Sequence, residues 1–530
     1  MKKLLSLLLT VLLVFSLFST VSASAEEETP RYDLEALGLP LSEEKITLTF
    51  WWPQAKDLGE LSSPGESELI QYLEEITNVH IEWIVPANGS EETAYQLLFT
   101  SDEMPDIVMQ RRSPYMVYRN GQDAAIEDGY FVDLNDYADC MPNYLAFLKS
   151  QPEYKAMALT DTGRREAMYQ SFYRPCETEC GIVIRKDLLD KAGFDIPVTY
   201  DDWHTVLTAF KEMGVYAPLY LMNNGASTNN EWSAGFGVAQ GFYNEDGTVK
   251  FGAIQGGWKE YLTLMNQWYA EGLLDPDFMA RTGEATDKDT EMLYSDNIGA
   301  WYDWTTRCDN NYVQRGAQNE NFLAVGVTPP KKNADDVTHL RSIDNRTSSR
   351  YSVSATSEHP DIAVRWLDLF YSWDIAQDAN YGMDDGRSFN YGEDGKRYLN
   401  SDFRYNNPEG VSSTAFFAKY GFKDPPLRIQ DFQQDIFLPL QHDSMVNWTA
   451  ESAKDDWMMP VNITMNAEES NTYNMIMADV TTYVNESAVQ FITGAMSFSE
   501  WDAYVARIKE MGIDEVTAIE QAALDRYNNR

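Results

Sequence analysis

The sequence predicts an α/β protein of two lobes, in which each lobe is a mixed sheet flanked by helices. Strand-like and helix-like segments alternate through the first part of the chain, as they do where helices cover a largely parallel sheet. The chain has 530 residues, which is more than one hydrophobic core usually serves. No long low-complexity linker divides it, so we expect the chain to cross the hinge between the lobes several times.

The first part of the chain shows three strands and two helix starts. Alternation of apolar and polar residues marks the first of these strands. Ser63, with Pro64 after it and Glu66 three positions on, forms a capping box with proline at the first helical position. A second helix is expected at Glu91–Leu98. The expected strands are 46–52, 80–85 and 106–109.

The stretch 181–203 carries a clear strand–helix–helix pattern. Gly193 ends the first helix, because glycine tolerates the left-handed backbone that follows a helix. Thr199 and Asp202 form a capping box that starts the second helix. The expected elements are a strand at 182–184 and helices at 187–192 and 203–213.

Two further helices are expected towards the C-terminus. Pro360 opens a helix at 361–372. Ser497 and Glu500 form another capping box, and the helix after it has apolar residues at i, i+3, i+4 and i+7, which predicts a buried face. The residues of that face are Trp501, Tyr504, Val505 and Ile508.

Residues 1–25 are expected to be a cleaved secretory signal peptide. Lys2 and Lys3 precede the apolar run 4–21, and Ala23 to Ala25 form a small-residue cleavage site. The run approaches membrane-spanning length, so an uncleaved anchor is the alternative, but the cleavage motif favours removal. No cysteine lies near the site, so we expect no lipid anchor. The mature chain would be extracytoplasmic, secreted or associated with the cell surface, with a flexible leader at 26–43.

The chain is strongly acidic, with a formal charge of −42 that becomes −44 without Lys2 and Lys3. Such a surface repels nucleic acid and anionic lipid, so we expect no nucleic-acid partner. It also disfavours a polyanionic ligand overall. No second apolar span follows the first, so we expect the mature protein to be soluble.

The cysteines, histidines and acidic loops give no metal or cofactor motif. Export permits a disulfide among the four cysteines, and we expect one, although a straight strand would hold Cys176 and Cys180 apart. No histidine stands at zinc-ligand spacing from a cysteine. Residues 287–291 have alternating oxygens without a turn glycine, which leaves calcium open but disfavoured. We expect no cofactor and no metal. The cysteines are Cys140, Cys176, Cys180 and Cys308.

Four segments together resemble the extracellular solute-binding proteins of ABC importers, in the large oligosaccharide-binding (family 1, lipoprotein A-like) branch. They occur in the order found in that family and extend over nearly the whole mature chain. One departure is Ile184, where the family often has an aromatic residue. The segments are 181–203, 257–278 with its Gly-Leu-hydrophobic-Asp-Pro-Asp motif, the Gly-Ala-aromatic strand 297–304, and 483–527.

This resemblance implies a fold, a function and a set of partners. The fold would be periplasmic-binding-protein-like, of type II. The protein would capture a small-molecule solute, an oligosaccharide, in the cleft between its lobes and deliver it to ABC transporter permease subunits, as a monomer and without catalysis. The hinge crossings would lie near 173–180, 350–355 and 438–445. Lobe 1 would hold 44–172 and 354–440, and lobe 2 would hold 173–353 and 441–530.

Nine residues are predicted to bind the ligand. Aromatic residues make up 13% of the chain, and a sugar ring packs its C–H face on an aromatic ring while its hydroxyls need polar partners. Most of the nine follow predicted strands, where open α/β sheets bind ligands. They are Trp52, Gln54, Arg111, Tyr173, Glu177, Trp232, Trp301, Trp304 and Trp448.

The reasons for predicting that these nine residues bind the ligand differ from one residue to another. Arg111 could donate paired hydrogen bonds to vicinal hydroxyls. Tyr173 and Glu177 lie in and just beyond the presumed hinge strand. Trp304, at the end of the Gly-Ala-aromatic strand, is the strongest candidate for stacking. A buried core position is about as common for Trp52, and a core or rim position is the commoner outcome for Trp232 and Trp448.

Two alternatives stay open. A secreted carbohydrate-active enzyme would also be acidic, exported and rich in aromatic residues, and it would need two carboxylates at a defined separation. The sequence contains no nucleophile elbow and no phosphate-binding or dinucleotide-binding loop. A binding protein for a peptide or another solute is the second alternative.

Overall fold

The structure is a computed structural model that describes residues 31–101, 103–111, 116, 118, 120–173, 178–221, 230–281, 289–309, 316–341, 349–429 and 435–530. Met1–Pro40 and Leu41–Arg530 form separate units. The predicted signal peptide lies outside the described residues. No helix within the described ranges is long and apolar enough to cross a membrane.

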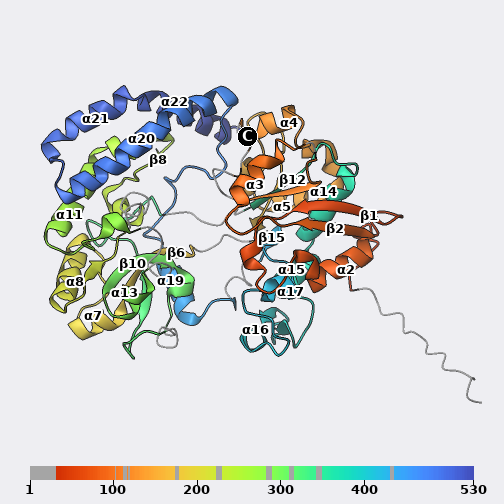
Figure 1. Ribbon diagram of the computed structural model, residues 1–530, viewed down its shortest axis with the longest axis horizontal. Helices are drawn as coiled ribbons and strands as arrows, with labels where there is room; N and C mark the ends of the chain where they lie inside the picture. The colour runs from red at the N-terminus through yellow and green to blue at the C-terminus, as the bar shows by residue number, and fades with distance from the viewer. Residues whose placement is uncertain are drawn as a thin grey trace, which may run out of the picture. The chain divides into compact units, whose positions relative to one another are not determined.

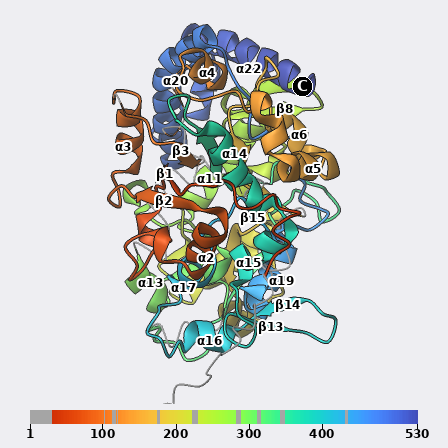
Figure 2. The same ribbon diagram turned by 90° about the vertical axis from the view of Figure 1, so that its right-hand side faces the viewer.

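The first lobe is built on a mixed five-stranded sheet in the order β2-β1-β3-β12-β4 (Figure 1). β1 pairs in parallel with β2 and β3, whereas β12 runs antiparallel to β3 and β4. In Figure 2 this lobe faces the viewer, with α2, α3 and α14 around its strands. The strands are β1 (Ile46–Trp51), β2 (Val79–Ile84), β3 (Ile107–Arg111), β4 (Met168–Tyr169) and β12 (Ser349–Val353), and the helices are α2 (Glu68–Thr77), α3 (Glu91–Leu98) and α14 (Pro360–Asp368).

Local sequence explains how these elements begin. Ser63 accepts a hydrogen bond from the backbone N–H of Gly65 and starts a single 3-10 turn, Pro64–Glu66. Ser67 then caps α2 through the N–H of Ile70, and Asn78 ends that helix with a left-handed φ of 61°. The expected capping box of Ser63 and Glu66 does not form, because Glu66 Oε1 accepts from the N–H of Ser62 at 2.7 Å instead, and the helix itself begins one turn later.

The second lobe is built on a mixed four-stranded sheet in the order β11-β6-β10-β7. Gly193 ends α7 in the left-handed region, and Thr199 with Asp202 forms the expected capping box of α8. Both expectations for the 181–203 stretch are confirmed. The strands are β6 (Cys180–Arg185), β7 (Ala217–Leu219), β10 (Ile298–Trp304) and β11 (Ala324–Val327), and the first helices are α7 (Lys186–Ala192) and α8 (Tyr200–Glu212).

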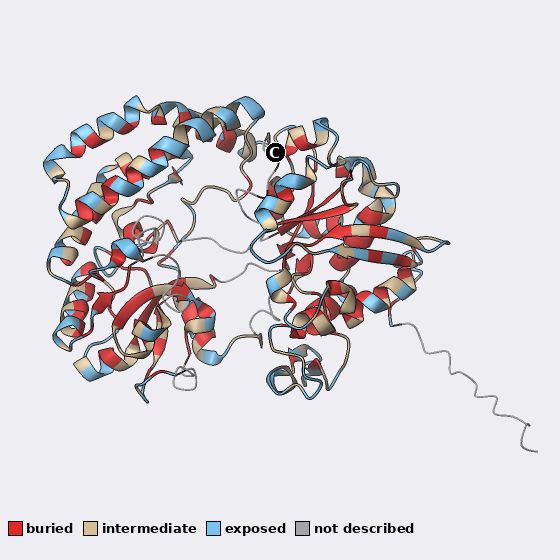
Figure 3. Ribbon diagram, in the orientation of Figure 1, coloured by how far each residue is buried: buried red, intermediate tan, exposed pale blue. Residues whose placement is uncertain are grey.

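Three C-terminal helices complete the second lobe, with α20 packed on α11 (Gly256–Ala270) and the other two packed on α20 (Figure 1). They are α20 (Ala467–Thr493), α21 (Trp501–Glu510) and α22 (Ile513–Asn528). Trp501, Tyr504 and Ile508 are buried as expected, and Val505 is half-buried against the same core. Figure 3 shows buried residues gathered on the strands of both sheets.

The remaining elements are short and lie between these. In the first part of the chain they are α4 (Gln122–Glu127), α5 (Pro142–Ser150), α6 (Glu153–Met157), β5 (Ser171–Phe172), α10 (Asn230–Ser233), β8 (Phe242–Glu245), β9 (Thr248–Phe251) and α13 (Thr290–Tyr294). In the later part they are α15 (Trp373–Tyr381), β13 (Phe389–Tyr391), β14 (Arg397–Leu399), α16 (Ser401–Tyr405), α17 (Phe416–Tyr420), β15 (Leu427–Arg428) and α19 (Pro439–Trp448).

Strand β12 joins the first sheet along its whole length, from Ser349 to Val353. The predicted second crossing, near 350–355, therefore falls after the chain has already returned to the first lobe. We move the proposed boundary of the returning segment to before Ser349. Helix α19 packs on β6 and β11 of the second sheet, so the last proposed crossing precedes Pro439.

The expected disulfide involves neither Cys140 nor Cys308, because both carry free thiols. Any scheme that pairs all four cysteines is therefore absent from this structure. Cys176 lies outside the described residues, so a disulfide that includes it stays a prediction with its partner undetermined.

Candidate functional site

A cavity of about 1390 Å³ opens between residues of both lobes. Residues of the first sheet and of α3 and α4 form one side, residues of β8, α20 and α22 form the other, and the segment 459–465 runs between them. The volume is larger than that of a typical pocket for a single small molecule. The side chains described in the next paragraphs are those that define its chemistry.

The first-lobe side rests on a buried polar network centred on Gln110. Its Oε1 accepts hydrogen bonds from Tyr95 Oη at 2.9 Å and from Arg350 Nη2 at 2.7 Å. Its Nε2 donates to Glu166 Oε1 at 2.7 Å and to Ser352 Oγ at 2.6 Å. Arg350 and Glu166 also form an ion pair at 3.5 Å. These contacts engage the Gln110 amide at both its oxygen and its nitrogen, whereas Glu166 Oε2 has only the ion pair with Arg350.

Arg111 extends this side towards the cavity at the end of β3. The segment 459–465 is fixed nearby through Asn462, whose Nδ2 donates to Tyr169 Oη at 2.8 Å. The Oδ1 of Asn462 accepts from Gln122 Nε2 at 3.2 Å. Gln122, Tyr169 and Asn462 all line the cavity, so a chain segment that leads into the second lobe's helices is anchored on the first.

The second-lobe side combines two aromatic rings with one carboxylate. The rings of Phe242 on β8 and Tyr473 on α20 have centroids 6.2 Å apart and are tilted by 42°. Met477 follows Tyr473 by one turn of α20, and Glu520 of α22 lines the same side. Burial raises the pKa of Glu520 to about 7, and burial raises the pKa of Tyr473 to about 12, with a smaller contribution from the Glu520 charge.

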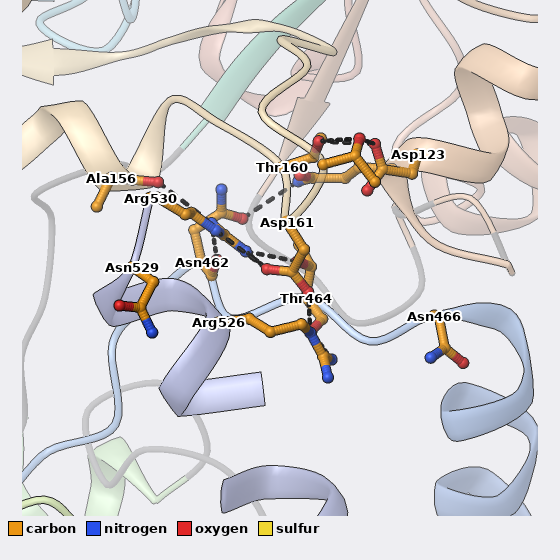
Figure 4. Close-up of polar contacts among 12 residues, drawn as sticks. Asp123, Ala156, Thr160, Asp161, Asn462, Thr464, Asn466, Arg526, Asn529 and Arg530 are labelled. Atoms are coloured by element: carbon orange, nitrogen blue, oxygen red, sulfur yellow. Dashed lines mark hydrogen bonds and ion pairs between the residues drawn. The ribbon is translucent and has the colours of Figure 1, made fainter. Parts of the chain in front are cut away.

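An ionic cluster ties α22 to the first lobe beside this cavity (Figure 4). Asp161, in the turn after α6, accepts hydrogen bonds from Arg526 Nε at 2.6 Å and from Arg530 Nη2 at 2.5 Å. Arg526 also pairs with Glu469 at the start of α20 at 2.6 Å. Arg530 donates to the carbonyls of Ala156 and Asn462. We call Asp161, Arg526, Arg530 and Glu469 the interlobe clasp.

Of the nine residues predicted to bind ligand, Arg111 lines this cavity. Trp52, Trp232, Trp301 and Trp448 are at most 2% exposed. Their rings belong to the cores of the two lobes, and a ring enclosed in this way offers no face to a sugar in this structure. Their predicted role in binding therefore gains no support, and the site proposed below does not use them.

The other four predicted residues lie outside the lining of this cavity. Gln54 is buried, and its Nε2 donates to Met109 Sδ at 3.7 Å. Tyr173 is 37% exposed and its ring packs against Trp373 at 4.7 Å. Trp304 is 41% exposed at the end of β10. Glu177 lies outside the described residues.

Sequence reasoning missed the second-lobe side and the segment 459–465. Tyr473, Met477 and Glu520 belong to helices whose apolar patterns indicate packing and do not mark a ligand site. The segment 459–465 carries the one usable signal, a stretch with Pro460 and no periodicity between two helices. Such a stretch predicts a connection without predicting that it lines a cavity.

The described residues contain no group of three or more histidine, cysteine, aspartate or glutamate side chains that could hold a metal ion. Asp287 and Lys288, which belong to the acidic stretch considered for calcium, lie outside them. Calcium binding at residues 287–291 therefore stays the open but disfavoured possibility that the sequence indicates.

The family model of the bacterial extracellular solute-binding proteins matches residues 60–375, and the chain belongs to this family. The chain is 24% identical to the fructooligosaccharide ABC transporter substrate-binding protein FusA of Streptococcus pneumoniae, across 98% of this chain and 97% of that relative.

Two solved structures share the fold. A solute-binding protein from Bifidobacterium longum infantis that binds human milk oligosaccharides (HMO) and is associated with an ABC transporter has a TM-score of 0.69 at 19% identity, covering 92% of this chain and 99% of that one. An alginate-binding protein has a TM-score of 0.67 at 20% identity, with the same coverage. The expected two-lobed type II fold is thus confirmed.

Proposed function

We propose that this protein captures an oligosaccharide in the cavity between its lobes and delivers it to the permease of an ABC transporter. The observation that carries the proposal is the composition of the cavity. One side presents the aromatic rings of Phe242 and Tyr473, and the other presents polar side chains that include Gln96 and Arg111. A sugar has an apolar C–H face and a rim of hydroxyls, and it needs both kinds of partner.

The relatives support the same ligand class. The curated relative that spans nearly the whole chain is a fructooligosaccharide substrate-binding protein, and solved structures of the same fold bind milk oligosaccharides and alginate. A cavity of about 1390 Å³ offers room for several sugar rings. Tyr173 and Trp304, which are exposed, stay in the proposal as secondary contacts for a long saccharide.

We further propose that the protein is a monomeric binding protein and performs no catalysis. Binding requires only that the solute stabilise one arrangement of the lobes, as in domain closure around a ligand. The proposal includes removal of residues 1–25 as a signal peptide. It places lobe 1 at 44–172 and from about 349 to 438, and lobe 2 in the remainder.

The test is a thermal-shift and calorimetry screen of the mature protein against fructooligosaccharides, milk oligosaccharides, alginate oligosaccharides and short peptides. We expect at least one oligosaccharide to raise the melting temperature without the appearance of new reducing ends. Turnover of a saccharide would support the alternative of a carbohydrate-active enzyme. A response to peptides alone would support the alternative of a peptide-binding protein.

A matched pair of variants locates the site. Tyr473→Ala removes a ring that lines the cavity, and we expect it to lower saccharide affinity about fivefold or more, since an aromatic contact contributes about 1 kcal/mol. Tyr391→Ala removes a ring that is 54% exposed on β13, outside the cavity lining, and should leave affinity unchanged. If circular dichroism shows that Tyr473→Ala is folded and it binds the saccharide as tightly as the wild type does, the ligand does not bind in this cavity.

A further inference from the structure

The Glu520 side chain is placed unusually for a carboxylate. It projects from α22 into the lining of the cavity, and the residue is only 9% exposed. Among the residues that the structure describes, no hydrogen-bond donor or cation pairs with it. A buried carboxylate without partners costs free energy, and a bound ligand that donates hydrogen bonds to it would offset that cost.

The surroundings of Glu520 indicate what kind of ligand that is. Tyr473 and Phe242 provide aromatic faces on the same side of the cavity, so a ring with an apolar face can lie within reach of the carboxylate. A carboxylate can accept about four hydrogen bonds and donates none when ionised. It therefore favours a ligand with many hydroxyl donors and disfavours one with carboxylates of its own.

The arginines of the cavity do not reverse this preference. Arg350 is already engaged by Gln110 and Glu166. Although burial opposes the shift, the charges of Lys423 and Arg428, followed by that of Arg111, lower the pKa of the Asp424 carboxyl. Glu92 of α3 adds a further carboxylate to the lining. Among the described residues that line the cavity, two carboxylates, Glu92 and Glu520, therefore stand against Arg111, the arginine that the Glu166 ion pair does not engage.

We propose that Glu520 contacts the bound solute directly, accepts hydrogen bonds from its hydroxyl groups, and selects neutral oligosaccharides over acidic ones. This inference rests on the proposed function, because it concerns the same cavity and the same class of ligand.

The protonation of Glu520 should make the affinity for a neutral saccharide depend on pH. In the free protein, burial raises the pKa of this carboxyl to about 7. The elements that pack against α22 are α20, β9, α21 and α6, and no charged side chain that the structure describes on them contributes to this shift. Tyr473 is the titratable group that faces it from α20. Hydroxyl donors stabilise the ionised form, so a bound neutral saccharide lowers this pKa. Affinity should then be highest above about pH 7 and fall as the pH drops through that value.

The experiment compares Glu520→Gln with the wild type, using a fructooligosaccharide as the neutral probe and an alginate oligosaccharide as the acidic one. The amide keeps the size of the side chain and removes its charge. We expect the affinity for the neutral probe at about pH 8 to fall about tenfold and its pH dependence between about pH 6 and pH 8 to disappear. The affinity for the acidic probe should rise, which a general loss of structure would not produce. If the fructooligosaccharide is not a ligand, the neutral saccharide that binds best in the screen replaces it.

Glu515→Gln provides the matched control, because Glu515 lies on the same helix and is exposed. It should leave both affinities and the pH dependence unchanged. If Glu520→Gln binds both probes as the wild type does, this inference is wrong while the proposed function stands. If the wild type binds no saccharide of the panel at any pH, the proposed function and this inference fall together.

Discussion

Trp448 lies against two glycines of the second sheet, and this contact fixes how α19 packs. Its Nε1 donates to the carbonyl of Ile182 at 2.9 Å, and its ring covers Gly181 on β6 and Gly326 on β11. A Cβ added at Gly181 would lie 2.5 Å from Cδ1 of the ring, and one added at Gly326 would lie 2.7 Å from Cε2. The glycines are required here because the indole approaches the backbone directly.

Gly181→Ala is therefore expected to destabilise the protein. The new methyl group would displace a buried ring that cannot move without disturbing the sheet, and overpacking of this kind costs about 1–3 kcal/mol. Urea unfolding at neutral pH measures the change. Gly241→Ala serves as the control, because a Cβ at Gly241 meets no heavy atom within 4 Å, and its midpoint should stay near that of the wild type. An unchanged midpoint for Gly181→Ala would show that α19 moves freely relative to the sheet.

The tryptophans also show why the site was only partly predictable at this scale. A tryptophan that follows a strand can face a cleft or a core, and the local sequence is the same in both cases. Trp301 is buried, and its Nε1 donates to Asp303 at 2.8 Å, whereas Trp304 three residues later is exposed. Arg111 lines the cavity because it stands at the end of β3, which the sequence marks, and its role in binding stays a prediction.

At the scale of elements, signals within one segment predicted well and signals between segments did not. The capping box of α8 and the left-handed Gly193 after α7 depend on residues within a few positions, so the sequence shows them. The pairing of β12 with β3 joins residues about 240 positions apart, and it moved a lobe boundary that the sequence alone had placed after it. For the same reason, α20 and α22 were expected as packing helices while their place beside the cavity was not foreseen.

The N-terminus of α5 illustrates a cap supplied by a different element. Met141 offers no capping side chain, and Asp368 at the end of α14 takes that role. Its Oδ1 accepts from the N–H of Tyr144 at 2.7 Å, and its Oδ2 accepts from the N–H and the side chain of Asn143 at 3.1 and 2.8 Å. Burial raises the pKa of Asp368 to about 6 against the lowering effect of these hydrogen bonds, so the carboxyl is ionised at pH 8.

Asp368→Ala should therefore cost more than an ordinary cap. It leaves two backbone N–H groups at a helix start without acceptors in a buried place, and we expect a loss of about 2–3 kcal/mol in the free energy of unfolding at pH 8. Asp361→Ala, in the exposed first turn of the same helix α14, removes a charge without a tertiary contact of this kind and should cost under about 1 kcal/mol. Equal losses for the two variants would argue that water replaces Asp368 at the α5 terminus.

At the scale of the whole molecule, the interlobe clasp fixes one end of the cavity. Arg530 is the more buried of its two arginines, with a side chain 1% exposed, while Asp161 is 12% exposed. Arg526 keeps Glu469 as a second partner, but the other contacts of Arg530 are neutral: two carbonyls and the hydroxyl of Thr464. The two lobes are thus held at this end by a carboxylate whose removal leaves one buried charge without a counterion.

Asp161→Ala should consequently destabilise the protein by about 3 kcal/mol, because an unpaired buried guanidinium costs far more than the loss of an exposed ion pair. The urea midpoint should fall by a similar amount at low and at high salt, since buried charges are poorly screened. Asp190→Ala breaks the Lys186–Asp190 pair, in which the carboxylate side chain is 59% exposed, and should change the free energy of unfolding by less than about 0.5 kcal/mol. If Asp161→Ala and Asp190→Ala unfold at the same urea concentration, the clasp does not hold the lobes together, and the cavity depends on the segment 459–465 and its Asn462 contacts for its shape.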